Sequence, residues 1–478
     1  LGLAGAGLGA AAAAAPVLND LDEVMASPQG ALKRPWWVKE RDLEDPTVEI
    51  DWNLVKPTDQ KERMYKLGPG GETTYSYRFT LYRSSIGGPV QDKMIEDQIK
   101  KYYPDWQGDT IRDLALSDAA QYGSMITRQG GPGESFLTPV NLDSPEERGM
   151  PRWQGTPEEN LRMIRTAFRF FGVTDVFVAE ITPNTKKLIY KACRPRWKEY
   201  VFEEVDQAYE TNTKQVIPNK CKWVIVWTVH QPYEGTMRSP AGISNAASSK
   251  AYNHISNIEG QMQNFLYGIG YHGLMGGTGA IGPSCAWGTM TGVGEMSRAY
   301  HVLTSPEYGN TLRGVNRMVT DLPLTPTRPI DAGIHRFYYD CKKCAEDCPS
   351  LSLMFEREPT WEHPTAPLAM NAALAANEDM LGDYPNWPWN VTGIKAWWLD
   401  VPTCVMCKAC MAACVFSKLD YASIHNTVKA IASITPIFNG FFRTMDDVFG
   451  YGIKNPEEFW ELNLPSYGID TTRGATRY

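Results

Sequence analysis

Apolar residues recur at helical spacing between residues 156 and 172. Leu161, Ile164, Phe168 and Phe171 are separated by three or four positions, which places them on one face of a helix. The positions between them are mostly polar or charged. The pattern therefore predicts an amphipathic helix whose apolar face is buried.

Both ends of this helix carry their own signals. Thr156 is followed by Pro157 and, three positions on, by Glu159, which is the pattern of a capped helix N-terminus. Gly172 follows the last apolar position and predicts the C-terminal end.

The pattern of apolar and β-branched residues predicts further elements along the chain. Residues 176–181 and 223–229 are rich in β-branched and aromatic side chains, which is typical of strands. A second helix is expected at residues 250–267, and a later one at 424–434, which Pro436 stops. The buried face of the second helix is predicted to contain Ile255, Ile258, Met262 and Phe265. Helices alternating with strands from 156 to 300 indicate an α/β layer domain.

Residues 268–294 contain ten glycines in 27 positions. Gly277, Gly279 and Gly282 match the spacing of a dinucleotide-binding motif, but Pro283 and more glycines follow where the helix of that motif should begin. We therefore expect neither that helix nor that motif. A plain flexible loop is one interpretation. The other is a segment whose backbone closely approaches a large flat ligand, since glycine has no side chain to prevent it.

Seven of the ten cysteines lie between residues 338 and 414. The second group has the spacing C-x2-C-x2-C-x3-C, and the first has C-x2-C-x3-C followed by Pro349. Bacterial ferredoxins use such runs to hold two iron–sulfur clusters, with the last cysteine of each run ligating the other cluster. The predicted ligands are Cys341, Cys344, Cys348, Cys404, Cys407, Cys410 and Cys414.

Zinc and disulfides explain these cysteines less well. A zinc site needs four ligands and not the three-residue step before Cys348 and Cys414, and cysteines three apart seldom have bridging geometry. A complete first run would also have cysteine at position 338, where this chain has Tyr338. The cluster of Cys341, Cys344 and Cys414 therefore lacks a fourth thiolate. The open alternatives are a three-iron cluster or a fourth ligand from among Tyr338, Asp340, Cys193, Cys221 and Cys285.

Composition and charge limit the number of domains, the class of partner and the location that we expect for the chain. The 478 residues allow two or three domains, and 47 basic against 55 acidic residues give a net charge of −8, which argues against a nucleic-acid partner. Residues 1–15 are small, uncharged and apolar, too short to span a bilayer, and resemble the apolar part of a twin-arginine export signal.

A chain with two clusters also needs a destination for its electrons. Flavin, molybdopterin and corrinoid are the candidates, and residues 151–333 are long enough to hold one of them. No D-x-H-x-x-G motif occurs, so a corrinoid with a protein histidine as its lower ligand is not expected.

Taken together, these features resemble those of a known family, the respiratory reductive dehalogenases, which are corrinoid and iron–sulfur enzymes. It is most similar to the branch that acts on chlorinated ethenes and small chloroalkanes. Tyr338 differs from the family's pattern, since close relatives have cysteine at that position. Besides both cysteine runs, the resemblance is carried by LGLAGAG at the start, PWWVKERDLEDPTVEIDW (35–52), PRWQGTPEENLRMIRTAFRFFG (151–172), TSPEYG (304–309), TDLPLTPTRPIDAGI (320–334) and TPIFNGFFRTMDDVFGYG (435–452).

The resemblance implies an α/β (α+β) fold with a nitroreductase-like corrinoid-binding domain and a ferredoxin-like domain with two clusters. It implies base-off cobalamin, a tyrosine proton donor and a basic residue near the cobalt. These fall on Tyr252 and Arg313, with Arg317 as the second candidate for the basic residue. We predict that the corrinoid is contacted by Gly276, Gly277, Gly279, Trp287, Gly292 and Tyr308.

On this basis the expected organisation has five parts. They are a signal remnant (1–15), an irregular α+β region (16–150), the corrinoid-binding domain (151–333), the ferredoxin-like domain (334–420) and a C-terminal wrapping segment (421–478). Trp36 and Trp37 are candidates for a substrate pocket, with core packing as the alternative.

The expected reaction replaces chlorine by hydrogen, or removes two chlorines, on small chlorinated ethenes or alkanes. The implied partners are a halogenated substrate, a membrane-anchor protein, a respiratory electron donor and a second copy of the chain. The implied location is the outer face of the cytoplasmic membrane. Two alternatives are an enzyme like the epoxyqueuosine reductases of tRNA modification, which would need a basic surface, and an electron-transfer ferredoxin subunit.

Overall fold

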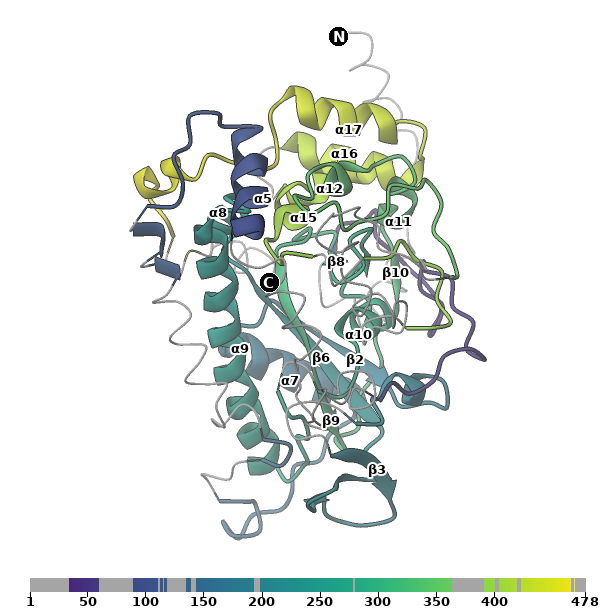
Figure 1. Ribbon diagram of the computed structural model, residues 1–478. Helices are drawn as coiled ribbons and strands as arrows, with labels where there is room; N and C mark the ends of the chain where they lie inside the picture. Colours follow the sequence, from purple (N-terminus) through teal and green to yellow (C-terminus); the bar gives the residue numbers. More distant parts are fainter. Residues whose placement is uncertain are drawn as a thin grey trace, which may run out of the picture.

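The computed structural model describes residues 34–59, 89–110, 112–114, 116–117, 135–138, 143–192, 198–277, 280–362, 391–399, 404–418, 423–465 and 468. These residues form a mixed α/β fold with helices on both faces of an antiparallel sheet. Figure 1 shows this sheet in the lower part of the molecule and a group of short helices above it. The mixed α/β class predicted from the sequence is therefore confirmed.

Three strands form the central sheet in the order β2 (Asp175–Glu180), β6 (Trp223–His230) and β9 (Leu312–Thr320), and all neighbours are antiparallel. The two strands predicted from the sequence match β2 and β6 to within one residue at each end. Because this sheet is antiparallel, it also lacks the parallel strands of a dinucleotide-binding fold.

Alternate residues of the strands face opposite layers. Val176 and Val178 of β2 pack with α7 (Pro157–Phe170) and α9 (Gly242–Gly268), whereas Phe177 packs with α10 (Ser284–Thr291) on the other side. Both faces of the sheet are thus buried, which explains why its strands read as nearly continuous apolar runs.

Helix α7 begins and ends where the sequence predicts. The Glu159 backbone N–H donates to Thr156 Oγ1 at 3.2 Å, and the Thr156 N–H donates to Glu159 Oε2 at 2.9 Å. Gly172 follows the helix with φ of +93°, a left-handed conformation that glycine adopts without strain. The capping prediction is confirmed.

Helix α9 starts eight residues earlier than predicted, at Gly242 rather than at 250. Its N-cap residue, Ala241, has no capping side chain. The carboxylate of Asp109 accepts hydrogen bonds from the Gly242 N–H at 2.9 and 3.1 Å instead. Because this cap comes from a residue 133 positions away, local sequence does not reveal it.

Helix α10 contradicts the expectation that no helix follows Pro283. Pro283 is its N-cap, and Gly292 ends it in the left-handed conformation. Gly288 lies within the helix, and a Cβ there would be 2.1 Å from Leu303 Cδ1 and 3.0 Å from Val315 Cγ1. The prediction was wrong because this glycine allows the helix to pack closely on two strands, rather than breaking the helix.

The remaining elements are short or peripheral. A second sheet has the order β3-β5-β4, and two-stranded pairs join β1 to β10 and β7 to β8. The predicted helix at 424–434 is present as α16. These elements are β1 (Lys39–Glu40), β3 (Glu199–Glu203), β4 (Tyr209–Glu210), β5 (Lys214–Pro218), β7 (Glu295–Met296), β8 (Leu303–Thr304), β10 (Ile330–Asp331), α5 (Pro89–Lys100), α8 (Tyr233–Met237), α11 (Ile334–Phe337), α12 (Lys343–Glu346), α15 (Ala409–Ala412), α16 (Ser423–Ile434), α17 (Asn439–Val448) and the 3-10 helices η3 (Thr185–Leu188), η4 (Val415–Ser417) and η5 (Glu457–Glu461).

A buried carboxylate fixes the connection from the sheet to the cysteine-containing region. Glu295 accepts hydrogen bonds from the backbone N–H groups of Ala332 at 2.8 Å, Ile334 at 3.1 Å and His335 at 3.0 Å. Burial raises the pKa of this carboxyl group, and the three donors stabilise its charged form. Glu295 thereby holds the start of α11, which leads directly to Tyr338 and Cys341.

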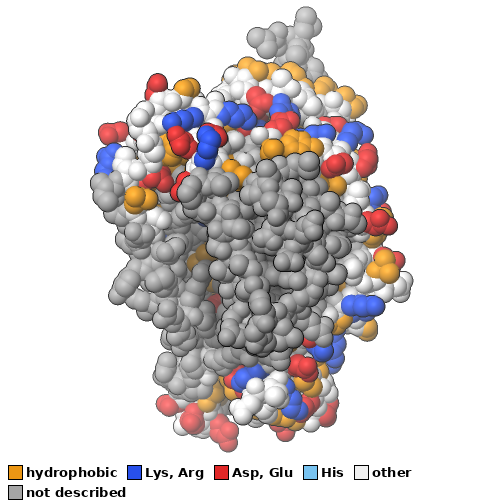
Figure 2. Space-filling model, in the orientation of Figure 1, with side chains coloured by type: hydrophobic (Ala, Val, Ile, Leu, Met, Phe, Trp, Pro, Cys, Tyr) orange, Lys and Arg blue, Asp and Glu red, His pale blue; other side chains and the backbone are white. Residues whose placement is uncertain are grey.

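The described surface is mixed in charge. Figure 2 shows acidic and basic side chains interspersed along the upper rim of the molecule. Within the described segments, none of the helices combines the length and the apolar character needed to span a bilayer. The proposed signal remnant at residues 1–15 lies outside the described residues.

The cap of α7 gives a stability prediction. Thr156→Ala removes an N-cap hydroxyl and should lower the free energy of unfolding by about 1 kcal/mol, as N-cap truncations do. Thr166→Ala is the matched control on the same helix. Its exposed hydroxyl donates only to the Arg162 carbonyl at 2.9 Å, so we expect no loss. Urea denaturation followed by circular dichroism measures both changes, and equal destabilisation by the two substitutions would contradict the capping role.

Candidate functional site

Four of the predicted ligands, Cys348, Cys404, Cys407 and Cys410, line one cavity of about 50 Å³. We call this group the four-cysteine cage. Cys348 comes from the first run and the other three from the second run, so one cage joins both runs. The backbone N–H of Ser352 donates to Cys348 Sγ at 3.3 Å. Desolvation raises the pKa of the Cys407 thiol to about 12, which disfavours its thiolate unless a cation lies beside it.

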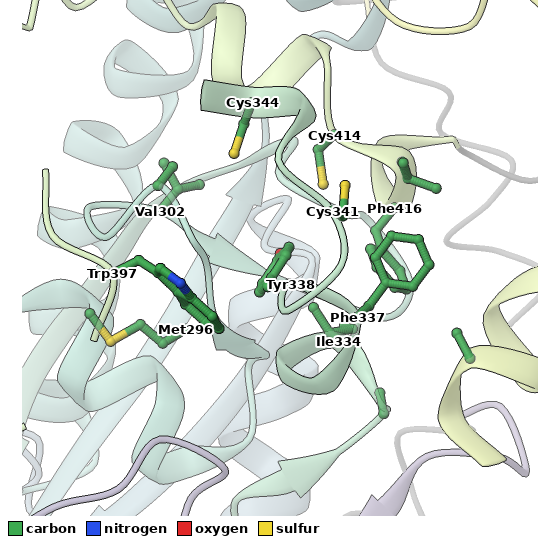
Figure 3. Close-up of a cluster of buried hydrophobic side chains, with 14 of the residues drawn as sticks. Met296, Val302, Ile334, Phe337, Tyr338, Cys341, Cys344, Trp397, Cys414 and Phe416 are labelled. Atoms are coloured by element: carbon green, nitrogen blue, oxygen red, sulfur yellow. The ribbon is translucent and has the colours of Figure 1, made fainter. Parts of the chain in front are cut away.

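The three other predicted ligands, Cys341, Cys344 and Cys414, line a second, smaller cavity together with Tyr338. We call this group the three-cysteine cage. Figure 3 shows the three sulfur atoms gathered in one region next to the Tyr338 ring. Burial raises the pKa of the Cys341 thiol to about 12, and that of the Tyr338 phenol well above its ordinary value.

A buried ion pair anchors this second cage. Lys343, next to Cys344 on α12, donates to Asp446 Oδ2 at 2.5 Å and to the Tyr451 carbonyl at 2.8 Å. Asp446 belongs to α17, so the pair ties the cage to the C-terminal helices. Lys343 also pairs with Asp447 Oδ1 at 2.9 Å, and Asp446 with Lys418 at 3.8 Å, so the buried charges form a network.

The other candidates for a fourth ligand lie elsewhere. Cys285 is on α10 at the wall of a different cavity, and Cys221 packs in the core beneath the central sheet. Asp340 Oδ1 accepts a hydrogen bond from Arg357 at 3.2 Å. Cys193 lies outside the described residues.

Tyr252 and Arg313 are brought together from α9 and β9. The Arg313 guanidinium carbon lies 5.4 Å from the centre of the Tyr252 ring. Arg313 also lines the four-cysteine cage. One cation therefore contacts both the candidate proton donor and the candidate electron site.

Gln231 holds Arg313 in this position and was not identified from the sequence. Arg313 Nε donates to Gln231 Oε1 at 2.6 Å, and Gln231 Nε2 donates to Thr236 Oγ1 at 2.6 Å. Gln231 is fully buried just after β6, next to Pro232. Its polar character at the end of a buried strand was the one available signal.

Arg317, the second candidate for the basic residue, has a different role. Its guanidinium donates to Ser284 Oγ at 2.8 Å and to the carbonyls of Ala280 and Gly282 at 2.5 and 2.7 Å. Arg317 therefore holds the glycine-rich segment in place, whereas Arg313 is the arginine beside Tyr252.

A larger cavity of about 320 Å³ adjoins the four-cysteine cage. Its wall is mainly apolar and includes the first turn of α10 and the end of the glycine-rich segment, Gly282 to Ala286. It shares His301, Leu399 and Met406 with the four-cysteine cage. The two spaces therefore meet.

His301 is a second residue that sequence reasoning missed. Its side chain is solvent-accessible and lines both cavities, and desolvation there lowers its pKa to about 4. Its Nδ1 lies 2.8 Å from the Ala299 carbonyl. The ring is therefore neutral at neutral pH, and a lone histidine in a sequence gives no sign of this.

The larger cavity does not test the predicted corrinoid contacts as a group. Gly276, Gly277, Trp287, Gly292 and Tyr308 are absent from the residues that line the larger cavity, and Gly279 lies outside the described residues. Trp287 is fully buried in the core, and Gly292 ends α10. All six stay predictions.

The two tryptophans proposed for a substrate pocket lie in different environments. Trp37 is buried in the core of the upper region, and Trp36 is exposed. The described wall of the larger cavity contains neither, but it does contain Trp52. Core packing is thus the role that the structure gives Trp37.

One more group of metal-binding residue types lies outside these cages. Cys221, His272 and Asp321 place their ligand atoms within 4.8 Å of one another. Asp321 already accepts ion pairs from Arg152 at 3.3 Å and Lys220 at 3.8 Å. Its charge is matched by protein cations, so the group is an ion-pair network at the C-terminal end of β9.

Comparisons with known proteins agree on one family. The protein-family model described as reductive dehalogenase subunit matches residues 110–324 of this chain. A trichloroethene reductive dehalogenase of Dehalococcoides mccartyi is 32% identical, over 98% of this chain and 96% of the relative. A chloroethene reductive dehalogenase of the same species, strain VS, is 31% identical over the same shares of both chains.

Solved structures show the same fold at lower identity. The catabolic reductive dehalogenase NpRdhA aligns with a TM-score of 0.54 and 18% identity over 86% of this chain. This chain spans about half, 49%, of the length of that protein. A reductive dehalogenase structure described with a mechanism for B12-dependent dehalogenation aligns equally well. Taken with the near full-length match to curated relatives, these findings show that the chain belongs to the reductive dehalogenase family.

Proposed function

We propose that this oxidoreductase removes chlorine from small chlorinated ethenes and alkanes. Replacement of one chlorine uses two electrons and one proton and releases chloride; removal of two neighbouring chlorines uses two electrons, forms a double bond and releases two chlorides. The observation that carries the proposal is the position of Arg313, between Tyr252 and the four-cysteine cage. The names of the relatives, which include trichloroethene and chloroethene, support this substrate class.

The proposal includes a corrinoid and two iron–sulfur clusters. Two groups of thiols, each drawing cysteines from both runs, fit two clusters. The apolar cavity beside the first turn of α10 fits part of a large flat group, since 320 Å³ is at the low end for small-molecule sites. In this proposal the fold is nitroreductase-like around the corrinoid and ferredoxin-like around the clusters. When bound, a corrinoid would supply the reducing chemistry for cleavage of the carbon–chlorine bond, and the clusters would supply single electrons.

The residues of the chain supply the proton and control charge. In this proposal Tyr252 donates its phenol proton to the organic fragment. The Arg313 cation, 5.4 Å from the ring centre, then stabilises the phenolate that remains and attracts the departing chloride. Arginine suits this role because it keeps its charge when partly buried. Gln231 fixes the guanidinium through its 2.6 Å hydrogen bond.

Two alternatives are weaker. An enzyme like the epoxyqueuosine reductases would bind RNA, which the net charge of −8 does not favour. An electron-transfer ferredoxin subunit would leave the Tyr252–Arg313 pair without a role. The near full-length match to dehalogenases favours the main proposal over both.

We further propose that the protein is exported and attached to the outer face of the cytoplasmic membrane by an anchor protein, and receives electrons from a respiratory donor. The support is the apolar sequence at residues 1–15 and the resemblance to the respiratory branch of the family.

Tyr252→Phe tests the proton donor. We expect the variant to bind cobalamin normally but to replace chlorine on a chloroethene about 100-fold more slowly or worse, since general acids contribute ~10²–10⁴-fold. Removal of two chlorines from a vicinal dichloroalkane consumes no proton, so its rate should change little. Chloride and organic products are measured after anaerobic reconstitution with an artificial reductant. Unchanged chlorine replacement would remove Tyr252 from the mechanism, and absence of bound cobalt and of chloride release in the wild type would overturn the proposed function.

Cys348→Ser tests the four-cysteine cage. This variant should lose about one to four iron atoms per chain relative to the wild type, because a cluster iron loses its thiolate. Cys285→Ser is the matched control, because Cys285 lies on α10 outside both cages, and its iron content should not change. Iron and sulfide analysis of reconstituted protein makes the comparison. Equal iron in both variants would exclude Cys348 as a ligand.

A further inference from the structure

The three-cysteine cage offers fewer donors than the four-cysteine cage. Among the described residues, its wall contains three thiols and no carboxylate, histidine or fourth cysteine. The residues at the wall are Ser297, Asn310, Phe337, Tyr338, Cys341, Lys343, Cys344, Cys414, Val415 and Phe416. Each iron of a cubane takes one protein ligand, so three thiolates satisfy three irons. Tyr338 is the residue that stands where the run would have its fourth cysteine.

The hydrogen bonds around Tyr338 determine where its proton lies. Asn310 Nδ2 donates to the Cys410 carbonyl at 3.4 Å, which fixes the orientation of the amide and turns its Oδ1 toward Thr304. That oxygen can only accept, so the single hydroxyl proton of Thr304 goes to it at 2.5 Å. The hydroxyl of Tyr338 also bonds to Thr304 Oγ1 and must therefore be the donor in that bond.

The packing of Tyr338 holds it in this arrangement. The residue is 4% exposed, and its ring meets the ring of Trp397 edge to face at 6.1 Å between centres. Its backbone carbonyl accepts a hydrogen bond from Arg298 Nη1 at 3.0 Å. To ligate iron, the phenol would have to lose its proton and its bond to Thr304. Lys343, the cation among the described wall residues, is already paired with Asp446.

We propose that the three-cysteine cage holds a three-iron cluster, and that Tyr338 fills the fourth corner as a neutral side chain that does not ligate. This inference rests on the proposed function, in which the cages hold iron–sulfur clusters. The four-cysteine cage, which Arg313 lines, then holds the four-iron cluster nearer the candidate active site. Cluster type is one of the factors that set reduction potential, so the two electron carriers differ in potential.

The experiment compares reconstituted wild type with Tyr338→Phe and Tyr338→Cys. We expect about seven iron atoms per chain in the wild type and in Tyr338→Phe, and about eight in Tyr338→Cys, where a fourth thiolate is restored. Electron paramagnetic resonance of the oxidised proteins should give a three-iron signal in the first two and none in the third. The three-iron signal should survive reduction with excess ferrous iron and subsequent reoxidation, because Tyr338 occupies the position that a fourth iron would take.

Each other outcome has a separate meaning. A wild type with about eight irons that falls to about seven in Tyr338→Phe would show that the tyrosine ligates, which overturns the inference. About eight irons in both, or a signal lost after added ferrous iron, would also overturn it, because another group then completes the corner. Cys348→Ser, which should gain a three-iron signal from the other cage, is the positive control. Absence of iron in every sample would instead defeat the proposed function.

Discussion

The convergence of thiols from two distant runs is the constraint on which the upper half of the molecule depends. Cys348 must meet Cys404, Cys407 and Cys410, and Cys414 must meet Cys341 and Cys344. Desolvation raises the pKa of five of these thiols, which disfavours their charged forms unless a cation lies beside them. The five are Cys341, Cys344, Cys407, Cys410 and Cys414. The surrounding protein therefore fixes the cages with strong polar contacts rather than with the thiols themselves.

Those contacts reach the cages from several directions. Glu295 holds the start of α11 through three backbone N–H groups, and the Lys343–Asp446 pair joins α12 to α17. Arg298 donates to the carbonyls of Tyr338 and Met354. Because each of these buried groups is held by more than one partner, the contacts act together to fix the cages. The positions of the sulfur atoms thus follow from the whole region.

The central sheet, below the cages, positions the two arginines of the candidate site. Strand β9 carries Arg313 and Arg317 four residues apart, and the two have separate functions: Arg313 faces Tyr252 and the four-cysteine cage, whereas Arg317 binds the glycine-rich segment. A register change in β9 would move both arginines together. The geometry of the candidate site is therefore set by the antiparallel pairing of β6 with β9.

The sequence by itself determined what depends on local spacing. The caps and apolar stripe of α7, the strands β2 and β6, and the grouping of seven cysteines were all readable because each is a pattern among near neighbours. Tertiary structure alone decided what depends on distant partners. Asp109 extends α9 by eight residues, Gly288 lets α10 form against β8 and β9, and Gln231 positions Arg313. The reason is physical: a hydrogen bond or a close contact between residues far apart in sequence leaves no periodic trace in the chain, so only the folded arrangement reveals it.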